Sequence, residues 1–186
     1  MLKRLSLIGM LCIPVAAWAF VKPVRVVAPA LAGLSCINDT LCTDDVSRFE
    51  EAAKLYDEAL HFVESSVNSI ENKPRVIFCS TDACFQSFGF RKQAGANIGI
   101  FGIVISPRAW KPYYVRHEII HHLQNEKLGM IKAWREPQWF MEGMAYSLSE
   151  DPRQKLSEPF EQYRSKFEVW YKQVGKERLW TEARNL

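Results

Sequence analysis

Residues 116–146 read RHEIIHHLQNEKLGMIKAWREPQWFMEGMAY, and this segment sets the expectations for the rest of the chain. His117 and His121 are four residues apart, so on a helix their rings lie on the same face and can hold one metal ion. Glu118 follows the first histidine, where its carboxylate can take a proton from a water at the metal. The segment thus contains the H-E-x-x-H pattern, in which the two histidines and the glutamate each have a chemical role.

The surrounding residues place this pattern in the middle of a helix. Pro112 suits a first helical position and Gly129 suits the residue just past a helix end, with no helix breaker between them. A second helix is predicted from Pro137 to about Ser149. It contains Glu142, whose carboxylate can complete a three-ligand site that leaves the fourth position open.

A second motif, W-x-x-E-G-x-A at residues 139–145, follows the first. Together the two motifs resemble the gluzincin branch of zinc metallopeptidases, the thermolysin-like or peptidase MA-like group. The resemblance implies one Zn²⁺ per chain in an α+β, zincin-like domain with a small mixed sheet. The roles that it implies are zinc ligand for His117, His121 and Glu142, and general base for Glu118.

Other members of the zincin class fit less well. The metzincin pattern needs a glycine and a third histidine where this chain has Gln124 and Lys127. His122 is about 100° round the helix from His121, so it is not expected to be a ligand. Tyr146, one turn after the third ligand, is a candidate for a partner that orients a histidine or for a donor to the transition state. Thermolysin has an aspartate at that offset, so the chain departs from the family pattern here.

The predicted elements surround these two helices. Apolar residues at three- and four-residue steps predict one long helix over 46–70, of about seven turns and capped by Thr43. His61 lies beside that apolar stripe and is expected to be a partly buried or surface histidine rather than a ligand. Short strands are expected at 24–27 and 75–79, and one or two more within 97–106. The resemblance implies that an edge strand binds an extended peptide substrate, for which 97–106 is the candidate.

Residues 156–186 are expected to form a helical, aromatic tail that packs on the domain. With 186 residues, 48% apolar and 24% charged, the chain suits a single domain over 20–186. Its net charge is +3, and subtracting Lys3 and Arg4 leaves +1. No basic run or arginine-rich face remains that would predict a nucleic-acid partner.

Residues 1–19 are interpreted as a signal peptide. Lys3 and Arg4 precede an apolar segment, and residues 17–19, Ala-Trp-Ala, have the form of a cleavage site. The alternative is an uncleaved anchor, which would give membrane association through residues 1–21. The protein is therefore expected to be exported, either periplasmic or secreted, or to be membrane-anchored and to face outside the cytoplasm.

Four cysteines lie beyond this segment, at positions 36, 42, 79 and 84. The simplest pairing is local, Cys36 with Cys42 and Cys79 with Cys84. A structural zinc site of four cysteines is the alternative, but an oxidising compartment favours disulfides.

The function expected from these features is that of an exported zinc metallopeptidase that hydrolyses peptide bonds in a peptide or protein substrate. The alternative is a non-catalytic zinc-binding scaffold or interaction module of the cell envelope. The presence of Glu118 argues against that alternative, because a site that only binds metal does not need a base there.

Overall fold

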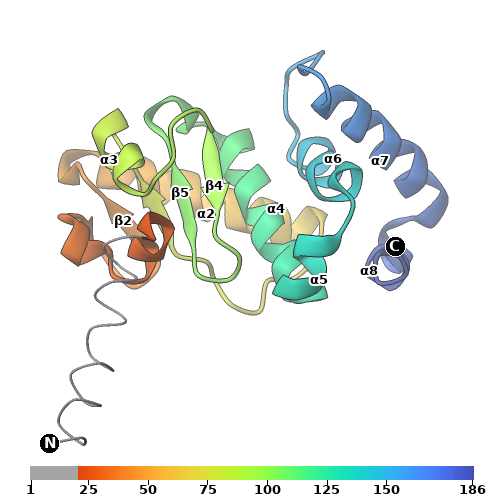
Figure 1. Cartoon of the computed structure of the whole chain (residues 1–186), viewed down its shortest axis with the longest axis horizontal. Coiled ribbons are helices and arrows are strands. Elements are labelled where there is room, and N and C mark those ends of the chain that lie inside the picture. Colours follow the sequence, from red (N-terminus) through yellow and green to blue (C-terminus); the bar gives the residue numbers. More distant parts are fainter. Residues whose placement is uncertain (1–20) are drawn as a thin grey trace, which may run out of the picture.

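The computed structural model describes residues 21–186, which form an α+β fold around one five-stranded mixed sheet (Figure 1). The strands are β1 (Ser35–Cys36), β2 (Leu41–Thr43), β3 (Val76–Phe78), β4 (Gly95–Asn97) and β5 (Ile103–Ile105). They lie in the order β1-β2-β3-β5-β4. Strands β2, β3 and β5 are parallel, while β1 and β4 pair antiparallel at the two edges. The predicted α+β class with a small mixed sheet is confirmed.

Within the described residues, two α-helices lie between strands in the sequence and five come after the last strand. The α-helices are α2 (Phe49–Ser66), α3 (Asp82–Ser87), α4 (Pro112–Leu128), α5 (Met130–Arg135), α6 (Gln138–Leu148), α7 (Phe160–Val174) and α8 (Leu179–Ala183). Short 3₁₀ helices are η1 (Lys22–Val27), η2 (Pro29–Ala32), η3 (Val46–Arg48), η4 (Pro107–Ala109) and η5 (Lys176–Arg178). Helices α2 and α4 pack together beside the sheet, α6 packs on α4, and α7 packs on α6 (Figure 1).

Two hydrophobic clusters cover the two faces of the sheet. Alternate residues of β3 divide between them, because successive side chains of a strand point to opposite faces. Val76 and Phe78 belong to the larger cluster with α2 and α4, while Ile77 belongs to the smaller one with Phe85 and Phe88. The central strands are therefore apolar on both faces, as buried parallel strands usually are.

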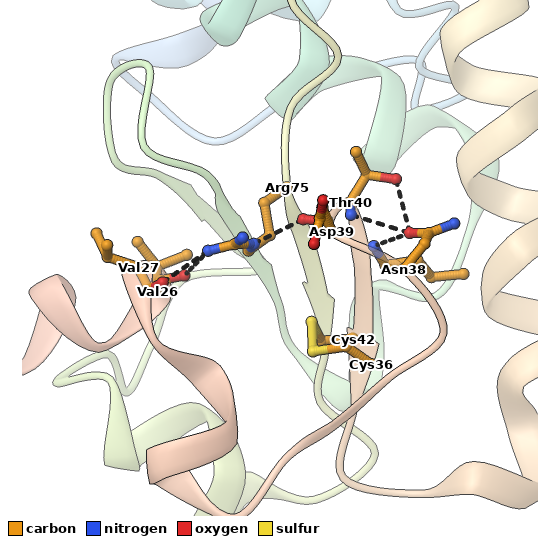
Figure 2. Close-up of a disulfide and its surroundings, with 9 residues drawn as sticks. Val26, Val27, Cys36, Asn38, Asp39, Thr40, Cys42 and Arg75 are labelled. Atoms are coloured by element: carbon orange, nitrogen blue, oxygen red, sulfur yellow. Dashed lines mark hydrogen bonds between the residues drawn. A yellow bond between two sulfur atoms is a disulfide. The ribbon is translucent and has the colours of Figure 1, made fainter.

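Both disulfides have the local pairing expected from the sequence, Cys36–Cys42 and Cys79–Cys84. Figure 2 shows that the first joins β1 to β2, where the two cysteines are directly opposite in the antiparallel register. Beside it, the Arg75 guanidinium donates hydrogen bonds to backbone carbonyls on both sides (Figure 2).

The prediction of a strand at 24–27 is wrong, because these residues lie in the 3₁₀ helix η1. Pro23 lies in the first turn, where its fixed φ and missing N–H suit a helix start. Arg75 Nη1 then donates to the carbonyls of Val26 and Val27 at 3.1 and 2.8 Å, so a side chain satisfies groups that a neighbouring strand would otherwise bind.

The long helix predicted over 46–70 is shorter, since η3 forms its first turn and α2 ends at Ser66. Thr43 lies in β2 rather than at a helix cap, and the Asp45 carboxylate caps η3 instead. Val67 and Ile70 stay buried while the chain turns toward β3. These two apolar residues continue the helical spacing of the sequence beyond Ser66, so the pattern predicted a helix that was too long.

The structure tests the prediction for the C-terminal tail but not the prediction for the N-terminal segment. Helices α7 and α8 confirm the predicted helical tail, and Phe167 of α7 is fully buried. The predicted signal segment, residues 1–19, lies outside the described residues. Between residues 21 and 186 no helix has the length and apolar character needed to cross a membrane. The two disulfides fit an extracellular or secreted location.

Candidate metal centre

Helices α4 and α6 supply the candidate site and form where the sequence predicted them. Helix α4 spans Pro112–Leu128, and Gly129 follows it with φ of 79°. That positive φ favours glycine, so it explains the end of the helix. Helix α6 spans Gln138–Leu148, within one residue of the predicted bounds at each end.

Three side chains of these helices converge as a group that can hold a metal ion. Donor atoms of His117, His121 and Glu142 all lie within 4.8 Å of one another. The two histidine Nε2 atoms are 3.1 Å apart, and each is 3.6 Å from a carboxylate oxygen of Glu142. Ligand atoms at about 2.0–2.1 Å from a tetrahedral ion lie roughly 3.3 Å apart, so this spacing fits a single ion held by all three.

Gln124 holds one of these histidines in place. Its Oε1 lies 2.7 Å from His121 Nδ1, and its Nε2 donates to the Met141 carbonyl at 3.0 Å. The Gln124 side chain is fully buried. An N–H at Nδ1 directed at Oε1 leaves the Nε2 lone pair of His121 facing the other donors. The sequence reasoning did not assign this role to Gln124, although its position three residues after His121 on the same helix was the available signal.

Tyr146 lies against the other histidine. The ring centroids of Tyr146 and His117 are 4.4 Å apart in an edge-on contact. Burial, and then the nearby charge of Glu142, raises the pKa of Tyr146 to about 12. The phenol is therefore a neutral O–H group at ordinary pH. Its contact with His117 places it next to the donor group, while its role as a partner or a transition-state donor stays a prediction.

The charge of Glu142 suits a metal ligand. Burial alone would raise its pKa, but the adjacent His121 and His117 outweigh burial and lower the pKa to about 2. Glu142 is thus ionised across the ordinary pH range, as a carboxylate ligand must be.

Glu118 is buried beside this group and faces the sheet. Its carboxylate faces strand β4, where it lies against Gly95 and near the backbone of Asn97. Burial is the main reason that its pKa is raised to about 7, with a further contribution from Glu142. Gly95 makes room for it, because a Cβ at Gly95 would lie 2.7 Å from both Cγ and Oε1 of Glu118.

The edge strand differs from the one predicted. Strand β5 pairs with β3 on one side and β4 on the other, so Ile103–Ile105 cannot pair with a further strand. The edge is β4, Gly95–Asn97, which shares only Asn97 with the predicted segment 97–106. Glycines and polar residues around β4 gave it weak strand character in the sequence, whereas the apolar β5 was conspicuous.

The remaining histidines lie outside the group. His61 is exposed on α2, one of the two positions, surface or partly buried, that were predicted for it. His122 is buried, and its Nε2 lies 2.7 Å from the Asn72 carbonyl. A hollow of about 1080 Å³ lies at the C-terminal end of α4, and none of the three donors lines it.

Helix α7 supports the ligand helix from the other side. Gly143, next to Glu142, allows this approach, since an added Cβ would lie 2.8 Å from both the Tyr163 carbonyl carbon and Phe167 Cβ. Trp139 packs against Trp170 of α7, with ring centroids 5.9 Å apart. The aromatic side of the tail therefore packs on α6, in agreement with the structural role predicted for the tail.

Comparisons with protein-family models, with curated proteins and with solved structures find no match for this chain. The function is therefore inferred from the chain's own residues. These provide a His117, His121 and Glu142 group that can bind a metal ion, with Glu118 buried beside it.

Proposed function

We propose that the chain is a zinc-dependent metallopeptidase of the gluzincin type. The observation that carries this proposal is the convergence of His117, His121 and Glu142 beside a buried Glu118 that faces an edge strand. The three-residue group, the buried glutamate and the edge strand could each occur separately in a protein without this activity. Their combination provides metal donors, a base and a binding edge for a substrate at one place.

The donor set favours zinc. Two imidazole nitrogens and one carboxylate are a recurrent set in catalytic zinc sites, which keep a fourth position open for water or substrate. His117, His121 and Glu142 would hold the ion. When bound, zinc supplies Lewis-acid activation of water and of the substrate carbonyl.

Glu118 is the proposed general base. Its pKa in the metal-free protein, raised to about 7, is a property of its buried position. A zinc ion bound beside it would lower this pKa and favour the carboxylate form, which is the form that accepts a proton. Glu118 would accept the proton of the attacking water and deliver it to the leaving amine of the cleaved peptide bond.

The proposed substrate is a peptide or protein in an extended conformation. Strand β4 has β5 as its one neighbour within the described sheet, so its outer edge can pair with a further strand. Glu118 lies against Gly95 of this strand, which brings the proposed base next to the edge. The cell envelope or the exterior is the proposed location, as the two disulfides suggest.

The test combines metal content with peptide cleavage. The parent protein should contain about one zinc per chain, His121→Ala should lose it, and the control His61→Ala, which changes an exposed histidine, should keep it. Glu118→Gln should keep zinc but cleave a peptide library at least about 100-fold more slowly. Zinc binding without cleavage by the parent would favour the non-catalytic scaffold. A folded parent that binds no zinc would refute both functions.

A further inference from the structure

Exposed apolar side chains gather on two neighbouring segments, the β4–β5 turn and helix α5. Trp134 is 83% exposed and Ile131 is 72% exposed, both on α5. Ile100 and Phe101, in the turn, are each 50% exposed, and Met130 is 39% exposed. We call these five residues the apolar face. Single exposed apolar residues are common, but a contiguous group of this kind marks an interaction site.

Contacts within the structure show that the two segments are adjacent. A Cβ at Gly99, in the turn, would lie 3.1 Å from Cε of Met130, so the turn lies against α5. Ile100, Met130 and Ile131 also line the same hollow. Ile100, Met130 and Ile131 therefore lie on one surface made by two segments that are separated in the sequence. Phe101 is next to Ile100 in the turn, and Trp134 is one helical turn after Met130 on α5.

Helix η1, near the start of the described chain, packs against the base of the β4–β5 turn. A Cβ at Gly102, at the base of the turn, would lie 2.8 Å from Cγ2 of Val26 in η1. In Figure 1 the first helical turns, the β4–β5 turn and α5 all lie along the lower side of the molecule. The sequence that precedes η1 contains no charged residue from Leu5 to Val21. The described chain thus begins on the same side of the molecule as the apolar face, and the sequence before it is apolar.

We propose that the apolar face lies on the surface of a phospholipid bilayer. Trp134 has the combination of apolar area and a polar N–H that favours the boundary between lipid headgroups and acyl chains. Next to it, Arg135 is exposed and can contact lipid phosphate, while Lys132 pairs with Glu136. The described chain begins on this side of the molecule, and the sequence that precedes it is apolar and suited to a lipid environment.

This membrane contact does not depend on the proposed peptidase activity, because none of the five residues belongs to the metal group. It does constrain how the protein would act. The β4–β5 turn continues directly from the edge strand β4. A bilayer at the turn would bring that edge close to the membrane surface, where polypeptides near the membrane would reach it first.

The test measures quenching of tryptophan fluorescence by lipid. The full chain, expressed with its own N-terminal segment, is mixed with or reconstituted into vesicles of phosphatidylcholine and phosphatidylglycerol whose acyl chains carry bromine. Every protein carries Trp18→Phe, so that the N-terminal segment contributes no emission. The matched variants are Trp134→Phe, which removes the reporter, and Trp134→Phe with Val169→Trp, which moves it to α7. Val169 is 63% exposed, and its helix α7 lies apart from α5 in Figure 1.

The expected result is that the Trp18→Phe protein loses about one fifth of its emission, the share of one of the five remaining tryptophans (six in the chain less Trp18). Neither Trp134→Phe nor the variant with the reporter moved to α7 should show such a loss. Equal quenching of both reporters, or no quenching of Trp134, would overturn the proposal. So would a shift of Trp134 emission to shorter wavelength that follows protein concentration without lipid, because a second copy would then cover the face.

Discussion

Replacing Gly95 by alanine should impair Glu118 without damaging the fold. The added Cβ would lie 2.7 Å from Glu118 Cγ, and ordinary contact begins at about 3.4 Å, so the side chain must retreat by about 0.7 Å. Gly95 is not among the glycines with positive φ, so alanine is compatible with its backbone. The atoms that must move belong to a flexible side chain, and the free energy of unfolding should stay within about 1 kcal/mol of the parent.

The effect on catalysis should be much larger than the effect on stability. A misplacement of about 1 Å in a catalytic group can cost about 100-fold in rate, so kcat for Gly95→Ala should fall by about 10- to 100-fold. The assay is peptide cleavage at saturating substrate, with zinc content and urea unfolding measured on the same preparation. A variant with the parent's zinc content and the parent's kcat would refute the assignment of Glu118 as the base held by this strand.

Three further predictions concern the neighbours of the site. Gly143→Ala should lower the free energy of unfolding by about 1–3 kcal/mol in urea titrations, since its Cβ meets the backbone of Tyr163, which cannot move aside as a side chain can. Gln124→Met should weaken zinc binding by about 10- to 100-fold in competition with a chelator, with its fold retained, because His121 loses its hydrogen-bond partner. In the metal-free protein, burial raises the pKa of Glu118 to about 7 from 4.5, so the folded state loses stability as pH rises through this range. Glu118→Gln should therefore be about 3 kcal/mol more stable than the parent above pH 7, and a difference that persists below pH 4.5 would contradict this origin.

The parts of the fold that the sequence predicted well are those with local physical signals. Pro112 and Gly129 bound α4 because proline and glycine act on the backbone of their own position. The disulfide pairing was predicted correctly because each pair of cysteines is close in the sequence, at separations of 6 and 5 residues. The donor group of α4 and α6 required one more step, the packing of two helices. The prediction that Glu142 joins the two histidines came from the resemblance to gluzincins, because the periodicity of the sequence does not show how two helices pack.

The errors arose where distant residues decide the conformation. Residues 24–27 have the β-branched content of a strand, but the guanidinium of Arg75, far along the chain, takes up their carbonyls and favours η1. The edge strand was misplaced because strand order depends on which strand pairs with β3, a choice that local sequence does not contain. Only part of the role of Gln124 depends on a distant residue: its contact with His121 is local, whereas its second partner is the Met141 carbonyl on another helix.

The aromatic tail illustrates how a structural element becomes part of a functional site. Glu142 lies on α6, and the face of α6 behind it is fixed by α7, which approaches closely enough to exclude any side chain at Gly143. Helix α7 is in turn held on α6 by ring contacts, in which Phe140 meets both Phe167 and Trp170 while Trp139 meets Trp170. The position of Glu142 relative to His117 and His121 therefore depends on residues that never touch the metal donors. The glycine of the E-G-x-A motif is thus explained by helix packing, and the glutamate beside it by the chemistry of the donor group.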